Sequence, residues 1–192
     1  MNSVKVKCTD SDCKNDLHCF KFLRRKMEEA ERGNCRDCGA SDIVDWNRLH
    51  QRNLKDLDYT FTALRNELIR SYCWNIDFDQ KAKQHARNKG LDKLKQGVRN
   101  RIEKSLAPAH PVRDGFQTPF SGNCIFYAQH ATACCCRTCL EYWHGITKGR
   151  ALSEEEITYC SRLVENFLTE RLSNLEVLPD WIRNNKGIGA GR

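Results

Sequence analysis

The 192-residue sequence has no long hydrophobic run, and this absence excludes two classes of protein. No apolar stretch approaches the ~20 residues that cross a bilayer as a helix. The first residues, Met-Asn-Ser-Val-Lys-Val-Lys-Cys, contain no apolar segment of the kind that a secretory signal requires. We therefore predict a cytoplasmic protein that has no membrane partner.

Hydrophobic residues are also sparse, at 40% of the chain against 30% charged residues. A chain of this length forms one ordinary domain or two small ones. A small module with a modest core usually needs disulfides or metal ions to hold its shape. Because thiols stay reduced in the cytoplasm, clustered cysteines there favour metal ligation, with disulfide bonds as the alternative.

Cysteine, in contrast, is abundant: there are twelve, and ten of them fall into two runs that also contain histidine. The first run comprises Cys8, Cys13, His18, Cys19, Cys35 and Cys38, and the second comprises Cys124, His130, Cys134, Cys135, Cys136, Cys139 and His144. Each run holds a Cys-x2-Cys pair, a spacing that lets one tight turn aim two thiolates at one tetrahedral ion. We therefore predict about two zinc ions per chain.

Residues 1–50 are predicted to form a zinc-ribbon-like module. A strand is expected over Cys19–Leu23 and a returning strand over Ile43–Trp46, because both segments are rich in strand-forming residues. His18 and Cys19 are substitute ligands if the wider Cys-x4-Cys loop points one thiol away. The expected ligands of this first site are Cys8, Cys13, Cys35 and Cys38.

Hydrophobic residues at helical spacing predict three helical regions, and we interpret their apolar stripes as core. The first runs from Leu54 to about Tyr72, and the second from Asp79 to Leu106, with Gly90 dividing it. The third begins after Ser153, which forms a capping-box pattern with the glutamate three residues later.

The second helical region holds most of the net charge. Between Asp79 and Lys104, nine basic residues stand against three acidic ones, which accounts for +6 of the chain's +7. A concentrated basic stretch is typical of phosphate binding, and a merely solvated helix face is the alternative. The candidate nucleic-acid contacts are Lys81, Lys83, Arg87, Lys93, Lys95, Arg99 and Arg101.

Residues 107–123 hold three of the four prolines and no helical period. Because this segment also carries charge, amide and aromatic groups, we predict a binding loop, with a plain linker as the alternative. The following Cys124–Ala128 is expected to be a strand that delivers His130 to the second cysteine run. A short helix is expected to open at the Cys-x2-Cys pair and to end at Gly145.

The predicted ligands of the second site are His130, Cys136, Cys139 and His144. Cys135 is then spare, part of the core, or reactive, because adjacent thiols rarely bind one zinc. An iron–sulfur cluster is the alternative, although the histidines favour zinc. Its four thiolates would come from Cys124, Cys135, Cys136 and Cys139. A zinc deaminase is excluded, because Thr132 occupies the position of the catalytic glutamate in that signature.

Three motifs in the second half also support a resemblance. They are Asp114-Gly115-Phe116-Gln117-Thr118-Pro119, Gln129-His130-Ala131-Thr132-Ala133, and Cys135-Cys136-Arg137-Thr138-Cys139-Leu140-Glu141-Tyr142-Trp143-His144-Gly145-Ile146. In these motifs the chain resembles an uncharacterised bacterial family, domain-of-unknown-function family 4186, from roughly Leu91 to Leu175. The resemblance implies that the proline-rich loop and the second cysteine run form one unit. Cys134 departs from the threonine of the family pattern, which argues against Cys134 as a ligand.

The expected fold class is α+β and mostly helical, with an N-terminal zinc ribbon, central amphipathic helices, and a C-terminal Cys/His zinc module with a capping helix. The expected divisions are a zinc-ribbon-like module (1–50), a basic helical segment (51–107), the loop with the second zinc module (108–178), and a disordered tail (179–192). The predicted function is that of a zinc-binding protein associated with DNA or RNA, without a more precise role. One alternative is an enzyme with its site between the 113–119 loop and the 130–144 cluster, and another is a subunit of a larger protein assembly. The candidate catalytic residues are Asp114, Gln117, His130 and Cys135.

Overall fold

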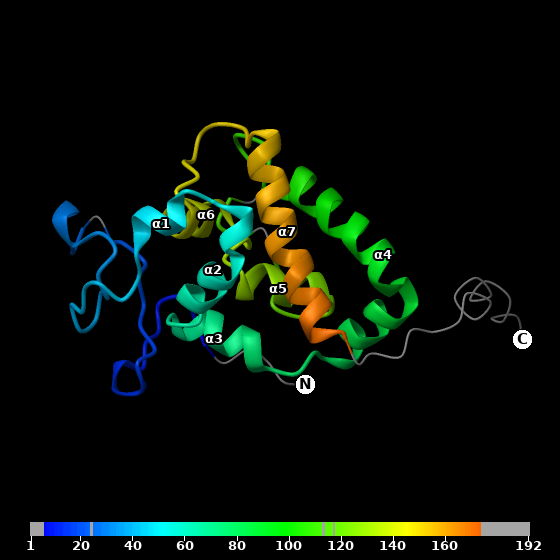
Figure 1. Cartoon of the computed structure of the whole chain (residues 1–192), viewed down its shortest axis with the longest axis horizontal. Helices are drawn as coiled ribbons and strands as arrows, with labels where there is room; N and C mark the ends of the chain where they lie inside the picture. Colours follow the sequence, from blue (N-terminus) through cyan, green and yellow to red (C-terminus); the bar gives the residue numbers. More distant parts are fainter. Residues whose placement is uncertain (1–5, 24, 113, 117, 174–192) are drawn as a thin grey trace, which may run out of the picture.

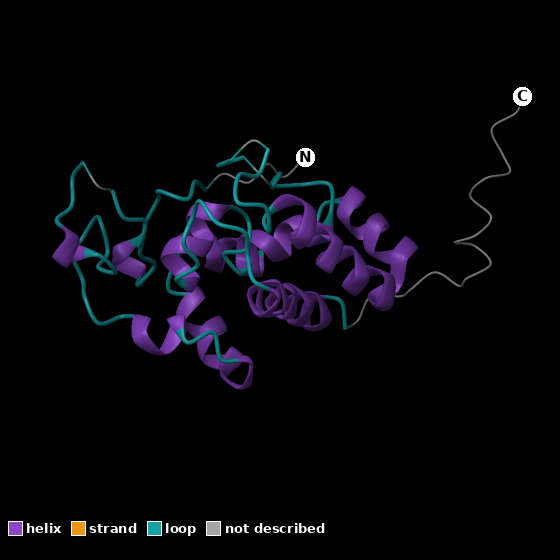
Figure 2. Ribbon diagram, turned by 90° about the horizontal axis from the view of Figure 1, so that it is seen from above, coloured by secondary structure: helices purple, strands orange, loops and turns teal. Residues whose placement is uncertain are grey.

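The computed structural model describes residues 6–23, 25–112, 114–116 and 118–173, and the regular structure in these ranges is helical (Figures 1 and 2). The elements are η1 (Cys13–Asn15), η2 (Glu29–Glu31), α1 (Trp46–His50), η3 (Leu54–Asp56), α2 (Leu57–Leu64), α3 (Leu68–Asn75), α4 (Gln80–Ser105), α5 (Cys124–Ala131), α6 (Arg137–His144) and α7 (Glu154–Arg171). Strand pairing in the described ranges is limited to two isolated bridges, Asp12 with Leu17 and His18 with Glu67. The prediction of a mostly helical chain is confirmed, and its β component is wrong.

The longest helices begin where a side chain accepts the backbone N–H groups that a first turn leaves unpaired. The Asp79 carboxylate accepts from the N–H of Ala82 at 2.8 Å and starts α4. The Ser153 hydroxyl accepts from the N–H of Glu156 at 3.2 Å, and the Glu156 carboxylate accepts from the N–H of Ser153 at 2.9 Å. The capping box predicted for α7 is therefore confirmed.

The basic helix α4 changes direction at Gly90. This glycine has φ 68° and ψ 166°, outside the helical region, so two helical stretches meet there. Residues with a Cβ rarely adopt this conformation, so a glycine is needed where the helix is divided. The predicted division is confirmed.

The segment predicted as a strand at Cys124–Ala128 is instead the start of α5. The side chain of Asn123 caps this helix by accepting from the N–H of Ile125 at 2.9 Å. Seven of the eight residues of α5 are buried, so the run is apolar on nearly all sides and shows no helical period. A short apolar run of this kind does not distinguish a strand from a buried helix.

The two strands predicted for the N-terminal module are also wrong. Residues 19–23 form no regular element, and α1 begins at Trp46, inside the expected returning strand. The described part of the first 44 residues is made of turns and two short 3-10 helices, both without a buried residue. This segment lies to one side of the helices in both views (Figures 1 and 2).

The single helix predicted from Leu54 to Tyr72 is interrupted after α2. His18 donates its N–H to the carbonyl of Asn66 at 2.7 Å, and its own carbonyl accepts from the N–H of Leu68 at 3.0 Å. These two bonds to a distant segment take up the Asn66 carbonyl and the Leu68 N–H, which a continuous helix would pair within itself. Tertiary contact, which the apolar stripe does not report, therefore separates α2 from α3.

The core is centred on α7, which packs against α4 and α5, while α5 also packs against α3 (Figure 1). Trp74 of α3 contacts Phe61 of α2 and Phe167 of α7 edge-on, with ring centroids 5.1 and 5.0 Å apart. The stripe predicted to be buried on α7 is buried, including Cys160. None of the helices in the described residues combines the length and the apolar character needed to cross a membrane.

The N-terminal segment joins this core through Phe20. Its ring lies edge-on to Trp143 of α6 and to Trp46 of α1, with centroids 5.7 and 5.5 Å away. Its N–H donates to the buried carboxylate of Glu67 at 3.3 Å. The predicted division into four segments stays a prediction, and the expected tail at 179–192 lies outside the described residues.

Candidate metal centres and a basic groove

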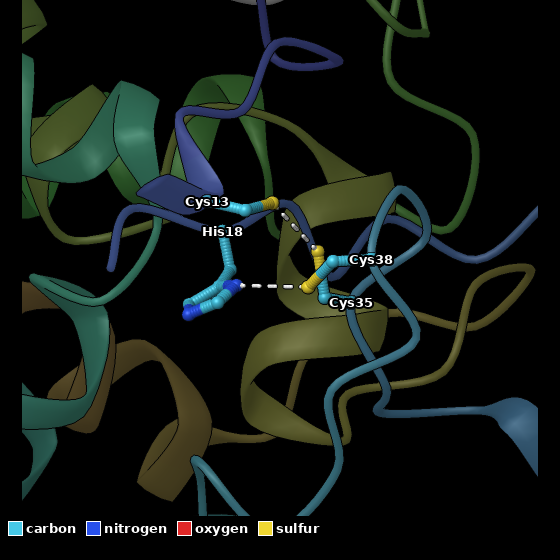
Figure 3. Close-up of side chains that lie close together, drawn as sticks. All are labelled: Cys13, His18, Cys35 and Cys38. Atoms are coloured by element: carbon cyan, nitrogen blue, oxygen red, sulfur yellow. Dashed lines mark hydrogen bonds between the residues drawn. The ribbon is translucent and has the colours of Figure 1, made fainter. Parts of the chain in front are cut away.

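Four side chains of the first run converge on one point (Figure 3). The ligand atoms of Cys13, His18, Cys35 and Cys38 all lie within 4.8 Å of one another. The Cys13 and Cys35 sulfurs are 3.7 Å apart, and the Cys38 sulfur is 3.6 Å from His18 Nδ1. Thiolates bound to one tetrahedral zinc at about 2.3 Å each would lie about 3.8 Å apart. We call this group the first centre, and its donors suit a closed Cys3His site.

A tight turn places the two cysteines of the Cys-x2-Cys pair. The N–H of Gly39 donates to the carbonyl of Cys35 at 2.8 Å, which closes the turn over Cys38. Gly39 has φ 74°, a conformation that glycine adopts without strain. Beyond the turn, the N–H of Arg36 donates to the carbonyl of Cys19 at 2.9 Å, which ties the pair to the segment that carries His18.

Three of the four ligands predicted for this centre are brought together, and Cys8 is not in the group. His18, the predicted substitute, occupies the fourth position. Cys8 packs instead against the core, where its carbonyl accepts from the thiol of Cys19 at 3.5 Å. The wide Cys-x4-Cys spacing was the signal that one of these two thiols would point away.

The electrostatics of the first centre favour one thiolate at neutral pH. Burial alone would raise the pKa of Cys35, but backbone N–H groups of Cys19, Cys38 and Asp37 hydrogen-bond its sulfur and lower its pKa to about 6. Burial raises the pKa of Cys13 to about 11. A metal ion that binds here therefore meets a preformed thiolate and displaces a proton from its neighbour.

The second run forms a smaller group, which we call the second centre. The sulfurs of Cys135, Cys136 and Cys139 lie within 4.8 Å of one another, with Cys136 and Cys139 3.4 Å apart. Cys136 is the N-cap residue of α6, and Cys139 is its third residue, so the first turn of the helix presents both thiols to one point. The helix ends at Gly145 with φ 63°, as the sequence predicts.

The two histidines predicted for the second site are not part of this group. His144 is fully buried, and both ring nitrogens have partners: Nδ1 is 3.2 Å from the Tyr159 hydroxyl, and Nε2 is 2.9 Å from the Thr132 carbonyl. Cys124, a ligand in the iron–sulfur alternative, lies 3.5 Å from Nδ1 of His85. Cys135, which the sequence left unassigned, is therefore the third thiol of the second centre.

His130 is buried close to the proline-rich loop. Its Nε2 is 3.2 Å from the carbonyls of both Thr118 and Pro119, and its ring stacks on Phe120 with centroids 3.9 Å apart. Burial lowers the pKa of His130 to about 4, so the ring is neutral at physiological pH. Within the described residues its Nδ1 is buried and has no hydrogen-bond partner.

Sequence reasoning missed Arg70, a fully buried arginine beside the second centre. Its guanidinium donates to the sulfur of Cys139 at 3.1 Å and to that of Cys135 at 3.7 Å, and it pairs with the carboxylate of Glu67 at 3.0 Å. Hydrogen bonds from the two neighbouring thiols, together with the positive charge of Arg70, lower the pKa of Cys139 well below its ordinary value. The one signal in the sequence was the pair of opposite charges at Glu67 and Arg70, three positions apart within the predicted helix from Leu54 to Tyr72.

The candidate catalytic residues lie in different environments. Asp114 is exposed on the loop, whereas His130 and Cys135 are only 4% and 3% exposed. Gln117 lies outside the described residues. The described candidates, Asp114, His130 and Cys135, therefore do not form one cluster that is open to solvent.

The end of α4 and the proline-rich loop enclose a groove of about 320 Å³. Its cationic lining comes from Arg101 and Lys104, and its aromatic lining from Phe116 and Phe126. The remaining lining residues are Ser105, Val112 and Pro119. Phe116 is 86% exposed and Val112 is 88% exposed, so the loop side of the groove presents apolar surface to solvent.

The predicted nucleic-acid contacts of α4 differ in their availability. Four of them are exposed: Lys81, Arg87, Lys93 and Lys95. Arg99 is half-buried and forms ion pairs with Glu103, at 2.8 Å, and with Glu154. Lys83 and Arg101 are also half-buried, and the Arg101 guanidinium lies 5.1 Å from the centre of the Phe126 ring.

The sequence profile of one protein family, described as Domain of unknown function (DUF4186), matches residues 58–169. The match covers more than half of the 192 residues and includes the second centre and the groove. The first centre lies before the matched segment. No solved structure matches the chain.

Proposed function

Because this chain belongs to the family described as a domain of unknown function (DUF4186), its role has to be argued from its own residues, and we propose that it is a zinc-containing protein that binds single-stranded nucleic acid. The groove between α4 and the proline-rich loop receives the strand. The observation that carries the proposal is the pairing, in one groove, of two cations with exposed aromatic surface.

This pairing is what an unpaired strand requires. Nucleic acid presents phosphates at regular intervals and flat bases between them. Arg101 and Lys104 supply positive charge on one side of the groove, while Phe116 supplies a ring for stacking on the other. Base stacking tolerates any sequence, because every base has an aromatic face.

The rest of α4 adds long-range attraction. This helix carries more cations than acids, and its last turns line the groove. Lys93 and Lys95, which precede the lining residues along α4, are exposed. Arg99 contributes less, because Glu103 and Glu154 neutralise it. We expect Lys95 and Lys104 to matter more for phosphate contact than Arg99.

Zinc is the metal that the first centre suits best. Three thiolates and one imidazole at tetrahedral spacing are typical of structural zinc sites, in which all four positions are filled by protein. Such a centre holds a small fold in place and takes no part in a reaction. The first centre would then contribute to nucleic-acid binding only indirectly. It would hold in shape the N-terminal segment, which packs on α1 and α6 through Phe20.

The test is fluorescence anisotropy with labelled 20-nucleotide DNA and RNA, single-stranded and duplex, over a range of salt concentrations. We expect single strands to bind more tightly than duplexes, with affinity falling steeply as salt rises. Lys104→Gln should weaken binding and reduce the salt slope by about 1. Phe116→Ala should cost roughly 1–3 kcal/mol of binding free energy with little change in that slope.

Two matched substitutions control for composition alone. Leu54→Ala removes another exposed apolar side chain, 44% exposed, and Lys55→Gln removes an exposed lysine; neither residue lines the groove. Both variants should bind like the unaltered protein. Equal losses in these controls and in the groove variants, or binding that is insensitive to salt, would contradict the proposal.

A further inference from the structure

The second centre presents three thiols, whereas a closed structural zinc site takes four ligands. Three sulfurs within 4.8 Å of one another are already close enough to share one ion. A fourth donor therefore has to come from a neighbouring side chain or from water. In the part of the chain that the structure describes, one nearby buried side chain has a ring nitrogen without a hydrogen-bond partner.

That side chain is His130. Its Nε2 lies 3.2 Å from two backbone carbonyls, which accept a proton and cannot donate one, so Nε2 carries the ring hydrogen. The neutral ring then has its lone pair on Nδ1, and this atom is buried without a partner among the residues that the structure describes. A buried acceptor left unpaired costs about 1–3 kcal/mol, so a ligand at Nδ1 would remove a real penalty.

The arrangement also matches how metal-bound histidines are held. In such sites the nitrogen that does not bind the metal usually donates to a backbone carbonyl or a carboxylate, which fixes the ring and its tautomer. Thr118 and Pro119 do this for His130, and Phe120 stacks against the ring.

Arg70 brings His130 and the cysteines into one neighbourhood. One of its terminal nitrogens, Nη1, lies 2.6 Å from the carbonyl of His130 and 3.7 Å from the sulfur of Cys135. The other, Nη2, lies 3.1 Å from the sulfur of Cys139. A single guanidinium group thus contacts the His130 backbone and two of the three sulfurs.

We propose that Nδ1 of His130 is the fourth ligand of a zinc ion held by Cys135, Cys136 and Cys139, with Arg70 as the hydrogen-bond donor to the bound sulfurs. His144 has no part in this site. The ion would connect α6 to the loop residues whose carbonyls hold His130, and Pro119 of that loop lines the groove. The proposal concerns the second centre alone and stands independently of nucleic-acid binding.

The test is cobalt titration of metal-stripped, reduced protein, followed by absorption in the sulfur-to-metal and ligand-field regions. The unaltered protein should take up two Co2+ per chain, one at each centre. His130→Ala should bind the second Co2+ more weakly and with shifted ligand-field bands, because water replaces the imidazole. His144→Ala, which removes a histidine with both nitrogens already paired, should bind both ions as the unaltered protein does. His130→Ala protein that still binds two Co2+ with unchanged ligand-field bands would overturn the proposal.

A second variant keeps the proposal testable if either alanine variant fails to fold. His130→Cys offers a thiolate in the same place and should retain two Co2+. Its sulfur-to-metal absorption should rise in proportion to seven bound thiolates in place of six, since each centre supplies three at present. Unchanged absorption in this variant would show that position 130 does not ligate the ion. If the unaltered protein gives the expected cobalt result but binds no nucleic acid, the groove proposal fails and the proposal for the second centre stands.

Discussion

At the scale of single residues, the Asp79 carboxylate connects three parts of the molecule. It accepts from the N–H of Ala82 at the start of α4, from the N–H of Gly122 at the end of the loop, and from the hydroxyl of Tyr127 on α5, at 2.8, 2.6 and 3.0 Å. Partial burial would raise the pKa of Asp79, but these hydrogen bonds to the charged form lower it below its usual value.

The sign of the pH dependence follows from that lowered pKa. A carboxylate whose pKa falls on folding stabilises the protein at pH values above its unfolded pKa, about 3.9. The stabilisation is lost as the pH falls through the lower folded pKa. Asp79→Ala should therefore reduce the free energy of unfolding by about 1–2 kcal/mol at pH 7, as the loss of a helix cap does, and by less at pH 3.

Urea denaturation at the two pH values measures this difference. Asp79→Asn is the control, because asparagine also caps helices well but carries no charge. It should lose less stability than Asp79→Ala at pH 7. An alanine variant with an equal deficit at both pH values would show that the charge of Asp79 contributes nothing.

The metal ligands show what single positions in a sequence can and cannot predict. The Cys-x2-Cys pairs were predictable, because a tight turn or the first turn of a helix brings both thiols together locally. The choice of His18 over Cys8 depends on how residues 18 and 66–68 pair, which is a long-range contact. Arg70 was not predictable for the same reason: its partners Cys135 and Cys139 are more than sixty positions away.

At the scale of elements, the two glycines of α4 have opposite roles. Gly90 adopts φ 68° and ψ 166°, a region that only glycine occupies without strain. Gly97 is helical, and a Cβ there would meet the nearest side-chain atom, of Ile125, at 3.4 Å, an ordinary van der Waals distance. Gly90→Ala should therefore destabilise the protein by about 1–3 kcal/mol. Gly97→Ala should stabilise it by about 0.4–1 kcal/mol.

The free energies of unfolding in urea, fitted with a common slope, separate these two effects. The two variants make the same chemical change in the same helix, so each is the control for the other. If both variants are stabilised, residue 90 can adopt a helical conformation at little cost. The conclusion that α4 requires a glycine at this break would then be wrong.

The elements that the sequence predicted correctly have their signals in adjacent residues. The start of α7 depends on Ser153 and Glu156 alone, and the break in α4 depends on Gly90 alone. The misassigned elements depend on distant contacts. α5 is buried on most sides and lacks a period, and the region from 54 to 72 is divided where His18 pairs with its backbone.

At the scale of the whole molecule, the two metal centres hold different kinds of structure. The second centre lies among helices that share an apolar core, whereas the described part of the first 44 residues buries only Phe20 and Val44 among its non-cysteine hydrophobic side chains. A segment with so little buried apolar surface cannot offset its conformational entropy without cross-links. A metal ion bound at the first centre would supply that cross-link.

Chelation should therefore release the N-terminal segment and leave most of the helices in place. In protein stripped of metal under reducing conditions, we expect trypsin to cut rapidly after the exposed residues Lys14, Arg25 and Lys26. Cleavage after Lys148, exposed in the link between α6 and α7, is the internal control and should change little. Far-UV circular dichroism should keep most of its helical signal, and added Zn2+ should restore protection at the first three positions. A cooperative loss of the whole helical signal on chelation would show that the ions, rather than the apolar core around α7, hold the helices together.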